Sequence, residues 1–376
     1  MATEIRILHT SDLHLDASLR AAGIASARAR ERCAAHLEAF DRVVAEAAHV
    51  DAHLLLIAGD LFEGAHTRPS TVRHVARQLE KWGRPVFVAA GNHDPIRDDC
   101  VYGLADWPAN VTLFRGTWEA CALPQLGLVV HGRGFTEPEE HGRLLEGLQL
   151  EGVGRHIVVA HGSDESSRPD RHQPYRPFTS AEIDAVPAVY VALGHFHRFA
   201  ELPTRRARAV YCGSPIPQGF QDTGTHGVVL ARLQGDRVEV ELRALPARRF
   251  IALRFDVTAA ETHAEVVERV SAAMEEHALQ EDFVRVHLEG ALPPDLEVDR
   301  AGLRDALAAR VHDIEVYDET FPEYDLDALA QEGTVRGQFV RTLSERMQAV
   351  EGTQRDTLQR AIFLGLDAFA GRPQRR

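Results

Sequence analysis

Short apolar runs recur along the first 250 residues and alternate with segments of helical periodicity. The first two helical segments span 26–49, where Phe40 and Val43 fall on one face, and 69–82, which Pro69 opens. Fully apolar strands between helices are typical of sheets covered on both faces, so the pattern predicts an α/β fold with central sheets flanked by helices. The predicted strands, several of them with the first loop residues that follow, span 5–12, 53–60, 85–94, 126–132, 156–162, 189–195, 209–214 and 227–233.

A different arrangement follows residue 250. Three strands alternate with two helices, which predicts a small α+β domain. The strands span 250–257, 282–290 and 313–319, and the helices span 260–278 and 299–310. Two amphipathic helices, 334–350 and 354–370, come last. The sequence therefore predicts three parts, which are a larger domain over 1–248, an α+β domain over 249–330 and a C-terminal helical segment over 331–376.

Polar residues stand just past the C-terminal ends of five predicted strands. In layered α/β folds these ends converge at one edge of the sheet, where loops from several strands build a site. Five polar groups delivered to that edge predict a functional site there. The five are Asp12, Asp60, Asn92, His161 and His195.

With neighbouring histidines, these residues form an ordered series of short motifs, D-x-H, G-D, G-N-H-D, H-G and G-H-x-H. Divalent ions in phosphoryl chemistry accept mixed imidazole and carboxylate ligands, and a bridging carboxylate holds two ions about 3.5–4 Å apart. Buried polar residues or helix caps are the alternative, but they do not account for a complete series in this order. The sequence therefore predicts a two-metal site with the ligands Asp12, His14, Asp60, Asn92, His161, His195 and His197.

Composition adds little to this picture. Apolar residues make up 44% and charged residues 26% of the 376 residues, which is ordinary for a globular protein of two domains. The chain has no run of about 18 apolar residues, no pattern of a secretory signal and no C-x-x-C pair. We therefore expect a cytoplasmic protein with reduced thiols and no membrane contact.

The net charge of −14 is concentrated towards the C-terminal end. Residues 1–250 carry 28 Lys and Arg against 31 Asp and Glu, whereas residues 251–376 carry 14 against 25. Binding to phosphates requires clustered Lys and Arg. The acidic C-terminal part is therefore not expected to be a free-standing DNA-binding module.

The ordered motifs resemble those of calcineurin-like metallophosphoesterases over about residues 4–235. Within that group they are similar to SbcD-like DNA-repair nucleases, including a compact YhaO-like bacterial branch. The resemblance rests on LHTSDLHLD (8–16), GDLFEGAHTRPS (59–70), AAGNHD (89–94), VALGHFH (191–197) and YCGSPIPQGF (211–220). It implies a metallophosphoesterase catalytic domain over 1–248 and a capping role for the α+β domain.

The resemblance also implies how the residues divide their work. One ion takes Asp12, His14, Asp60 and His197, and the second takes Asp60, Asn92, His161 and His195, so Asp60 bridges the two. His93 is then the catalytic histidine, which contacts the phosphate and helps the leaving oxygen depart. Asp94 fixes the loop or orients that histidine. The two divalent ions are expected to be Mn²⁺, with Mg²⁺, Fe²⁺ and Zn²⁺ as alternatives.

One position departs from part of the family. Eukaryotic and archaeal relatives tend to place a histidine three residues after the aspartate of G-D, where this chain has Glu63. Bacterial relatives often carry an acid there, which favours the bacterial branch. The sequence leaves open the role of Glu63, and whether His66 substitutes for that histidine.

Three functions stay open at this point. The resemblance favours a DNA exonuclease or endonuclease of DNA repair that acts on single strands or end structures, as a homodimer, with an SMC-like ATPase of the SbcC type. The C-terminal helices would either bind that ATPase or pack on their own small domain. A small-molecule or nucleotide phosphodiesterase is the second hypothesis, favoured by the acidic C-terminal part. A weakly active scaffold that regulates an ATPase is the third, and the complete ligand set argues against it.

Overall fold

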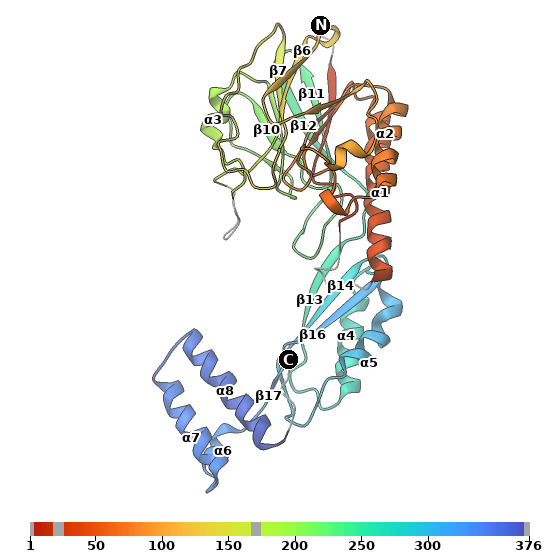
Figure 1. The fold of residues 1–376 in the computed structure, drawn as a ribbon. Helices are drawn as coiled ribbons and strands as arrows, with labels where there is room; N and C mark the ends of the chain where they lie inside the picture. The colour runs from red at the N-terminus through yellow and green to blue at the C-terminus, as the bar shows by residue number, and fades with distance from the viewer. Residues whose placement is uncertain (1–3, 18–25, 167–173, 372–376) are drawn as a thin grey trace. The chain divides into compact units, whose positions relative to one another are not determined.

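The computed structural model describes residues 4–17, 26–166 and 174–371 (Figure 1). The chain divides into two compact units, an N-terminal unit, Met1–Arg248, and a C-terminal unit, Arg249–Arg376. Among the described residues, no helix combines the length and apolar character needed to cross a bilayer.

Two six-stranded sheets form the N-terminal unit, in the orders β12-β11-β1-β2-β3-β4 and β5-β6-β7-β8-β10-β9. Strands β1 to β4 are parallel in the first sheet, and β6, β7, β8 and β10 are parallel in the second. The remaining strands pair antiparallel at the sides. Their bounds are β1 Ile5–Thr10, β2 Leu54–Ala58, β3 Val86–Ala89, β4 Val111–Phe114, β5 Glu119–Leu123, β6 Leu128–Arg133, β7 Arg155–His161, β8 Tyr190–Gly194, β9 Ala200–Glu201, β10 Arg208–Tyr211, β11 Gly227–Gln234 and β12 Arg237–Ala244.

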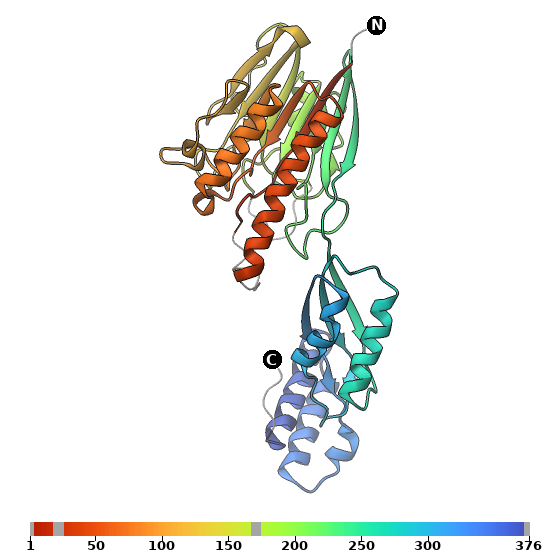
Figure 2. The ribbon, with the colours of Figure 1, turned by 90° about the vertical axis from the view of Figure 1, so that its right-hand side faces the viewer.

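The two sheets pack face to face, and helices cover the outer face of the first. Because side chains alternate along a strand, Ile7 of β1 enters the layer between the sheets, whereas Leu8 packs beneath the helices. Figure 2 shows α1 (Ser26–His49) and α2 (Pro69–Trp82) side by side on that outer face. The short α3 (Ser180–Ala185) packs on the outer face of the second sheet. This layering confirms the predicted α/β fold and explains why the strands are apolar throughout.

The C-terminal unit begins with a three-stranded parallel sheet, β13 (Phe250–Asp256), β14 (Phe283–Glu289) and β16 (Asp313–Asp318), in that order. Helices α4 (His263–Glu275) and α5 (Arg300–Leu307) pack on it through a core that includes Val266, Val286 and Leu303. A short parallel pair, β15 (Ala291–Leu292) and β17 (Phe321–Pro322), follows.

Three helices complete the C-terminal unit, α6 (Leu326–Ala330), α7 (Val335–Gln348) and α8 (Thr353–Phe369). Their shared core is small, with Val340, Ile362 and Leu366 buried. Helix α8 also contacts the segment that precedes α6, because Phe363 stacks on Phe321 with ring centroids 5.9 Å apart. The two predicted amphipathic helices are therefore present, and α8 packs in part on its own unit.

The core between the two sheets of the N-terminal unit should carry much of its stability. Leu56, on β2, is fully buried there. We expect Leu56→Ala to lower the free energy of unfolding by about 2–5 kcal/mol, because it removes apolar contacts and leaves a cavity. Urea denaturation followed by tryptophan fluorescence measures this, since Trp82, Trp107 and Trp118 all lie in this unit. Leu104→Ala, at a residue 39% exposed, is the control and should change it by less than about 0.5 kcal/mol. Equal losses in the two variants would contradict the assignment.

Candidate metal centre

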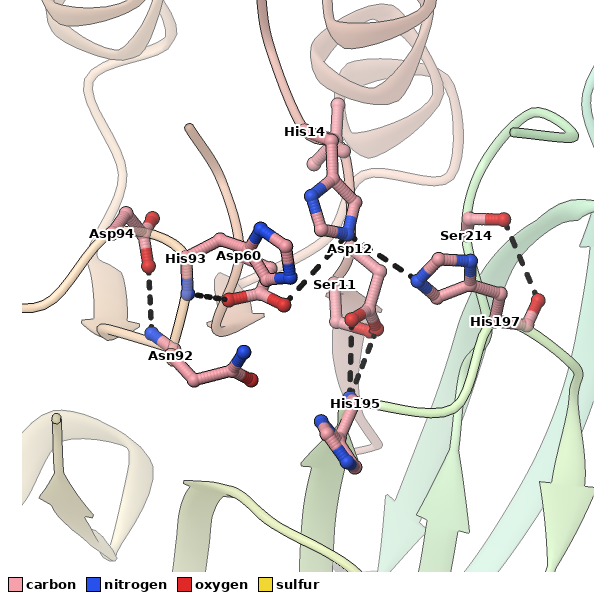
Figure 3. A network of polar contacts seen from close by, with 12 residues as sticks. Ser11, Asp12, His14, Asp60, Asn92, His93, Asp94, His195, His197 and Ser214 are labelled. Atoms are coloured by element: carbon pink, nitrogen blue, oxygen red, sulfur yellow. Dashed lines mark hydrogen bonds and ion pairs between the residues drawn. The ribbon is translucent and has the colours of Figure 1, made fainter. Parts of the chain in front are cut away.

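Seven side chains predicted from separate motifs meet at the C-terminal ends of strands from both sheets. Figure 3 labels six of them, all but His161. Asp12 and His14 follow β1, Asp60 follows β2, Asn92 follows β3, His161 ends β7, and His195 and His197 follow β8. Three of these side chains, those of Asp12, Asp60 and His161, are almost wholly buried. The structure therefore brings together every residue of the predicted ligand set.

One part of the site is organised around His161. Its Nδ1 lies 2.9 Å from the carbonyl oxygen of Ala58 and must donate to it, so in the neutral ring Nε2 carries the lone pair. His161 Nε2 lies 3.3 Å from Asp60 Oδ2 and 3.1 Å from Asn92 Oδ1. His195 Nδ1 lies 3.3 Å away. Acceptor atoms thus face one another here, and a cation satisfies such an arrangement.

The other part of the site repeats this design with two more rings. His14 Nδ1 lies 2.9 Å from Glu63 Oε2, and His197 Nδ1 lies 3.2 Å from Asp222 Oδ2. Because the carboxylates accept the hydrogens on Nδ1, the Nε2 atoms of the neutral rings carry lone pairs. The two Nε2 atoms nevertheless lie only 3.3 Å apart. Ligand histidines in metal sites are oriented in this way by a second hydrogen bond.

Asp60 lies between the two parts. Its Oδ2 is 3.3 Å from His161 Nε2 and 3.7 Å from His14 Nε2. Donor atoms lie within 4.8 Å of one another in three groups of side chains, which are Asp12, His14 and His197, then His14, Asp60 and His93, and then Asp12, Asp60 and His161. The mixed imidazole and carboxylate donors therefore fit two divalent ions with a shared carboxylate.

The electrostatics of this cluster favour positive charge. Burial acts to lower the pKa of His161, but the carboxylate of Asp60 outweighs it and raises this pKa to about 9. Burial acts to raise the pKa of Asp60, and its pairing with His161 nevertheless keeps it well below its usual value. Buried carboxylates and imidazoles are stable this close together only when protons or a cation are held among them.

The backbone is strained where it presents these side chains. Asp12, His14 and Asp60 have φ of 53°, 46° and 50°, and His195 has φ of 114°. Such values are uncommon for residues other than glycine and are stabilised by surrounding contacts. The amides of Asp12 and His14 donate to the carbonyl oxygens of Gly59 and Asp60 at 3.0 and 2.9 Å. The ligand loops of β1 and β2 therefore hold each other in position.

Two glycines make room for the ligands. A Cβ atom on Gly59 would lie 2.2 Å from His161 Nδ1, and one on Gly91 would lie 2.1 Å from Asp60 Oδ1. Both distances are far below contact, and Gly59 also has φ of +92°. Glycine is therefore required before Asp60 and Asn92 by direct contact with ligand side chains.

His93 lies beside the cluster and reaches solvent, with 44% of its side chain exposed. Its amide donates to Asp60 Oδ1 at 2.9 Å, and its Nδ1 lies 3.1 Å from Glu63 Oε1. Burial acts to lower the pKa of His93, but the contact with Glu63 and the charge of Asp60 raise it to about 9. The ring lines a cavity of about 550 Å³, together with Asn92, Arg97 and Tyr175.

Asp94 is fully buried and its carboxylate is engaged by the surrounding loop. Oδ1 accepts a hydrogen bond from the amide of Gly91 at 2.7 Å. Oδ2 accepts from the amide of Phe62 at 3.1 Å and from the hydroxyl of Tyr102 at 2.7 Å. These contacts favour the loop-fixing role of Asp94 over orientation of the His93 ring.

Two partners of the ligands were not assigned from the sequence. Glu63 stood out only as a departure, and its contacts with two histidines depend on the fold. Asp222 lies just beyond the YCGSPIPQGF segment, whose turn brings it to His197. His66 is exposed in the short helix Gly64–His66, and its ring makes no hydrogen bond within the described part of the chain.

Two packed sheets with outer helices, and a buried imidazole and carboxylate cluster at their strand ends, define a metal-dependent hydrolase. A family model described as calcineurin-like phosphoesterase matches residues 5–199. The chain belongs to this family, which acts on phosphoesters and uses a dinuclear metal site.

Similar proteins lie in the branch that the motifs indicated. The chain is 26% identical to the uncharacterized metallophosphoesterase YhaO of Bacillus subtilis, over 85% of this chain and 80% of that protein. It is 27% identical to the DNA double-strand break repair protein Mre11 of Haloferax volcanii, over 82% of this chain and 67% of that protein. It is 26% identical to SbcD, a subunit of the SbcCD nuclease of Escherichia coli K12, over 58% of this chain and 62% of that protein.

The contact between Asp222 and His197 should matter for metal binding. We expect Asp222→Ala to weaken Mn²⁺ binding about 10–100-fold, because His197 loses the group that fixes its ring and tautomer. Isothermal titration calorimetry on the full chain measures this. Asp236→Ala removes an exposed carboxylate in the turn after β11 and is the control. Unchanged affinity in Asp222→Ala would show that the contact does not orient a ligand.

Proposed function

We propose that this chain is a cytoplasmic, Mn²⁺-dependent phosphodiesterase that cleaves DNA, at single strands or end structures, in DNA repair. Two groups of side chains with facing lone pairs share Asp60 and lie beside the exposed ring of His93. This arrangement is the observation that supports the phosphoester chemistry. The step to DNA is supported by the relatives, one of which is named as part of a nuclease and another as a DNA break repair protein.

The proposed ligand sets follow the two parts of the site. Asp12, His14, Asp60 and His197 hold one ion, and Asp60, Asn92, His161 and His195 hold the other. When bound, the two ions activate water and neutralise charge on the phosphate oxygens. Glu63, Asp222 and the Ala58 carbonyl keep three of the rings turned towards the ions. Asp94 holds the loop that carries Asn92 and His93.

His93 is proposed as the catalytic histidine. It lies on the solvent side of the cluster, where a bound phosphate would meet it, and Glu63 engages its Nδ1. Its Nε2 is then the atom available to donate a proton to the leaving oxygen. The cavity beside it, about 550 Å³, has the size of a small-ligand site and suits a leaving group of nucleotide size.

A nucleotide phosphodiesterase is the second candidate. The observation in its favour is the acidic C-terminal part, since residues 251–376 carry 25 Asp and Glu against 14 Lys and Arg. Such a surface repels a polyanion but has little effect on a small diester held at the metal centre.

A substrate panel separates these functions. With Mn²⁺ added, we expect the full chain to cleave single-stranded and hairpin DNA, and EDTA to abolish cleavage. His93→Ala should lower kcat about 10²–10⁴-fold, with Mn²⁺ binding retained, because it removes the proton donor and none of the seven proposed ligands. Denaturing gels and calorimetry measure both. Cleavage of cyclic nucleotides alone would overturn the nuclease assignment, and no cleavage of any ester would favour a scaffold.

An SMC-like ATPase of the SbcC type is the proposed partner, with α8 as the contact. Leu364 is 37% exposed and Phe369 is 49% exposed on this helix. We expect Leu364→Glu to reduce co-purification of the co-expressed ATPase at least several-fold, because a charge enters an apolar contact. Val153→Glu, at a fully exposed residue of the N-terminal unit, is the matched control. Equal recovery with both variants would refute α8 as the contact. A homodimer is also proposed from the resemblance, and light scattering tests it.

A further inference from the structure

The turn that carries Asp12 and His14 is held by two side chains from other segments of the chain. Nδ1 of His36, on α1, donates to the carbonyl oxygen of Leu13 at 2.8 Å. Nε2 of Gln218 donates to the carbonyl oxygen of Asp12 at 3.2 Å. These two carbonyl groups are consecutive, and they belong to the two peptide units between the proposed ligands. The spacing of Asp12 and His14 therefore depends on His36 and Gln218.

Backbone hydrogen bonds hold the other side of this turn. The amides of Asp12 and His14 donate to the carbonyl oxygens of Gly59 and Asp60. Asp12 and His14 have φ of 53° and 46°, which are uncommon values for residues other than glycine. Such conformations persist where several contacts define them. The two side-chain hydrogen bonds thus complete the support of a strained turn.

The surroundings of His36 indicate that its ring serves this hydrogen bond. His36 is 2% exposed, and burial lowers its pKa to about 3, so the ring is neutral. Because Nδ1 carries the hydrogen, Nε2 keeps a lone pair, which has no hydrogen-bond partner among the described residues. Burial of an unpaired polar atom costs free energy. An apolar side chain would pack here at lower cost, so the contact with Leu13 is what accounts for a histidine.

Gln218 connects the same turn to a ligand that follows β8. Its amide donates to Asp222 Oδ2 at 2.9 Å, and this oxygen also accepts from His197 Nδ1 at 3.2 Å. Its side chain reaches the carbonyl oxygen of Asp12. Gln218 therefore fixes the loop of Asp12 and the ring of His197 relative to each other.

Helix α1 supports both of these side-chain contacts. Arg32 lies one turn before His36 on this helix, and its Nη2 donates to the carbonyl oxygen of Pro217 at 2.8 Å. Burial lowers the pKa of Arg32 to about 10, so the guanidinium stays charged at neutral pH. Hydrogen bonds from a charged donor are roughly twice as strong as those between neutral groups. Because Pro217 directly precedes Gln218, this bond holds the Gln218 backbone in place.

We propose that His36 and Gln218 are positioning residues for one of the two ions, which we call the first ion. The inference rests on the proposed function and deepens it. The first ion is the one proposed at Asp12, His14, Asp60 and His197, and the second ion is the one proposed at Asp60, Asn92, His161 and His195. Without either side-chain hydrogen bond, the turn loses part of its support and its two ligands are less well oriented. The second ion keeps its orienting contact, which is the hydrogen bond from His161 to the carbonyl oxygen of Ala58.

Calorimetric titration of the full chain with Mn²⁺ tests this proposal. We expect the unaltered chain to bind two ions. In Gln218→Leu, one ion should bind about tenfold more weakly and the other should change by less than about threefold, because leucine fills a similar volume but donates no hydrogen bond. Gln221→Leu changes an exposed glutamine of the same turn and is the matched control, which should leave both affinities unchanged.

Two substitutions of His36 separate the hydrogen bond from packing. Asparagine can place an amide nitrogen where the ring has Nδ1, whereas leucine places a methyl group there. We expect His36→Leu to weaken the first ion about tenfold and His36→Asn to keep its affinity within about threefold. Thermal unfolding of the metal-free chain shows whether both variants are folded. Gln218 is partly exposed, so Gln218→Leu provides the test if the buried substitutions unfold the protein.

Removal of one ligand shows which ion is weakened. In a His161→Ala background the remaining ion is the first, and Gln218→Leu should weaken it about tenfold. In a His197→Ala background the remaining ion is the second, and the same change should have an effect of less than about threefold. Electron paramagnetic resonance of free Mn²⁺ measures the binding of the remaining ion in each case.

The outcomes separate the inference from the function on which it rests. Unchanged binding in Gln218→Leu, equal weakening of both ions, or equal losses in His36→Leu and His36→Asn would overturn the positioning role. Two bound Mn²⁺ ions without cleavage of any diester would overturn the proposed function instead. In that case a loss confined to one ion in Gln218→Leu would still support the positioning role.

Discussion

Hydrogen-bond acceptors face one another at the centre of the N-terminal unit, and only positive charge among them stabilises this arrangement. His161, His14 and His197 each use Nδ1 to bind an oxygen of the surrounding protein. Their lone pairs are thereby directed at one another and at Asp60. Such a cluster would be unfavourable in a buried site without protons or cations. The hydrogen bonds of the three Nδ1 atoms, more than the ligand types themselves, therefore favour metal binding at this site.

The sheets supply the stability that this site requires. Four of the candidate residues have positive φ, and each such conformation costs on the order of 1–3 kcal/mol. Strands β1, β2, β7 and β8 are buried on both faces, which fixes the positions where these loops begin. The loops then bind each other, as when the amide of His195 donates to the carboxylate of Asp12 at 3.1 Å. Apolar packing in the layers thus offsets the strain at the edge.

Much of this arrangement could be predicted from the sequence. The helices over 26–49 and 69–82 match α1 and α2, because their periodicity is strong and Pro69 marks a helix start. Strand β12 was not predicted, because the prediction relied on fully apolar runs, whereas β12 alternates charged and apolar residues as a strand with one exposed face does. The six-residue α3 was missed because it is too short to show a helical repeat, although the capping box of Thr179 and Glu182 is a sequence signal for its start. The positive φ values fall on Asp and His, which adopt them more often than most residues do, but residue type alone does not show which of them will. The contacts of Glu63 and Asp222 depend on loops that only the fold brings together.

The cavity beside the His93 ring is lined by residues of the G-N-H-D motif and by residues outside the five motifs, among them Arg97 and Pro138. The wall near Pro138 is held from within by Arg176, whose buried guanidinium binds Glu140 and the carbonyl oxygen of Gly134. The guanidinium also lies over the ring of Phe135, 4.2 Å from its centroid. The same short segment places Tyr175 against His195, with ring centroids 5.7 Å apart. The wall of the cavity near Pro138 and the ring of Tyr175 beside His195 are thus held by one ion pair between Arg176 and Glu140.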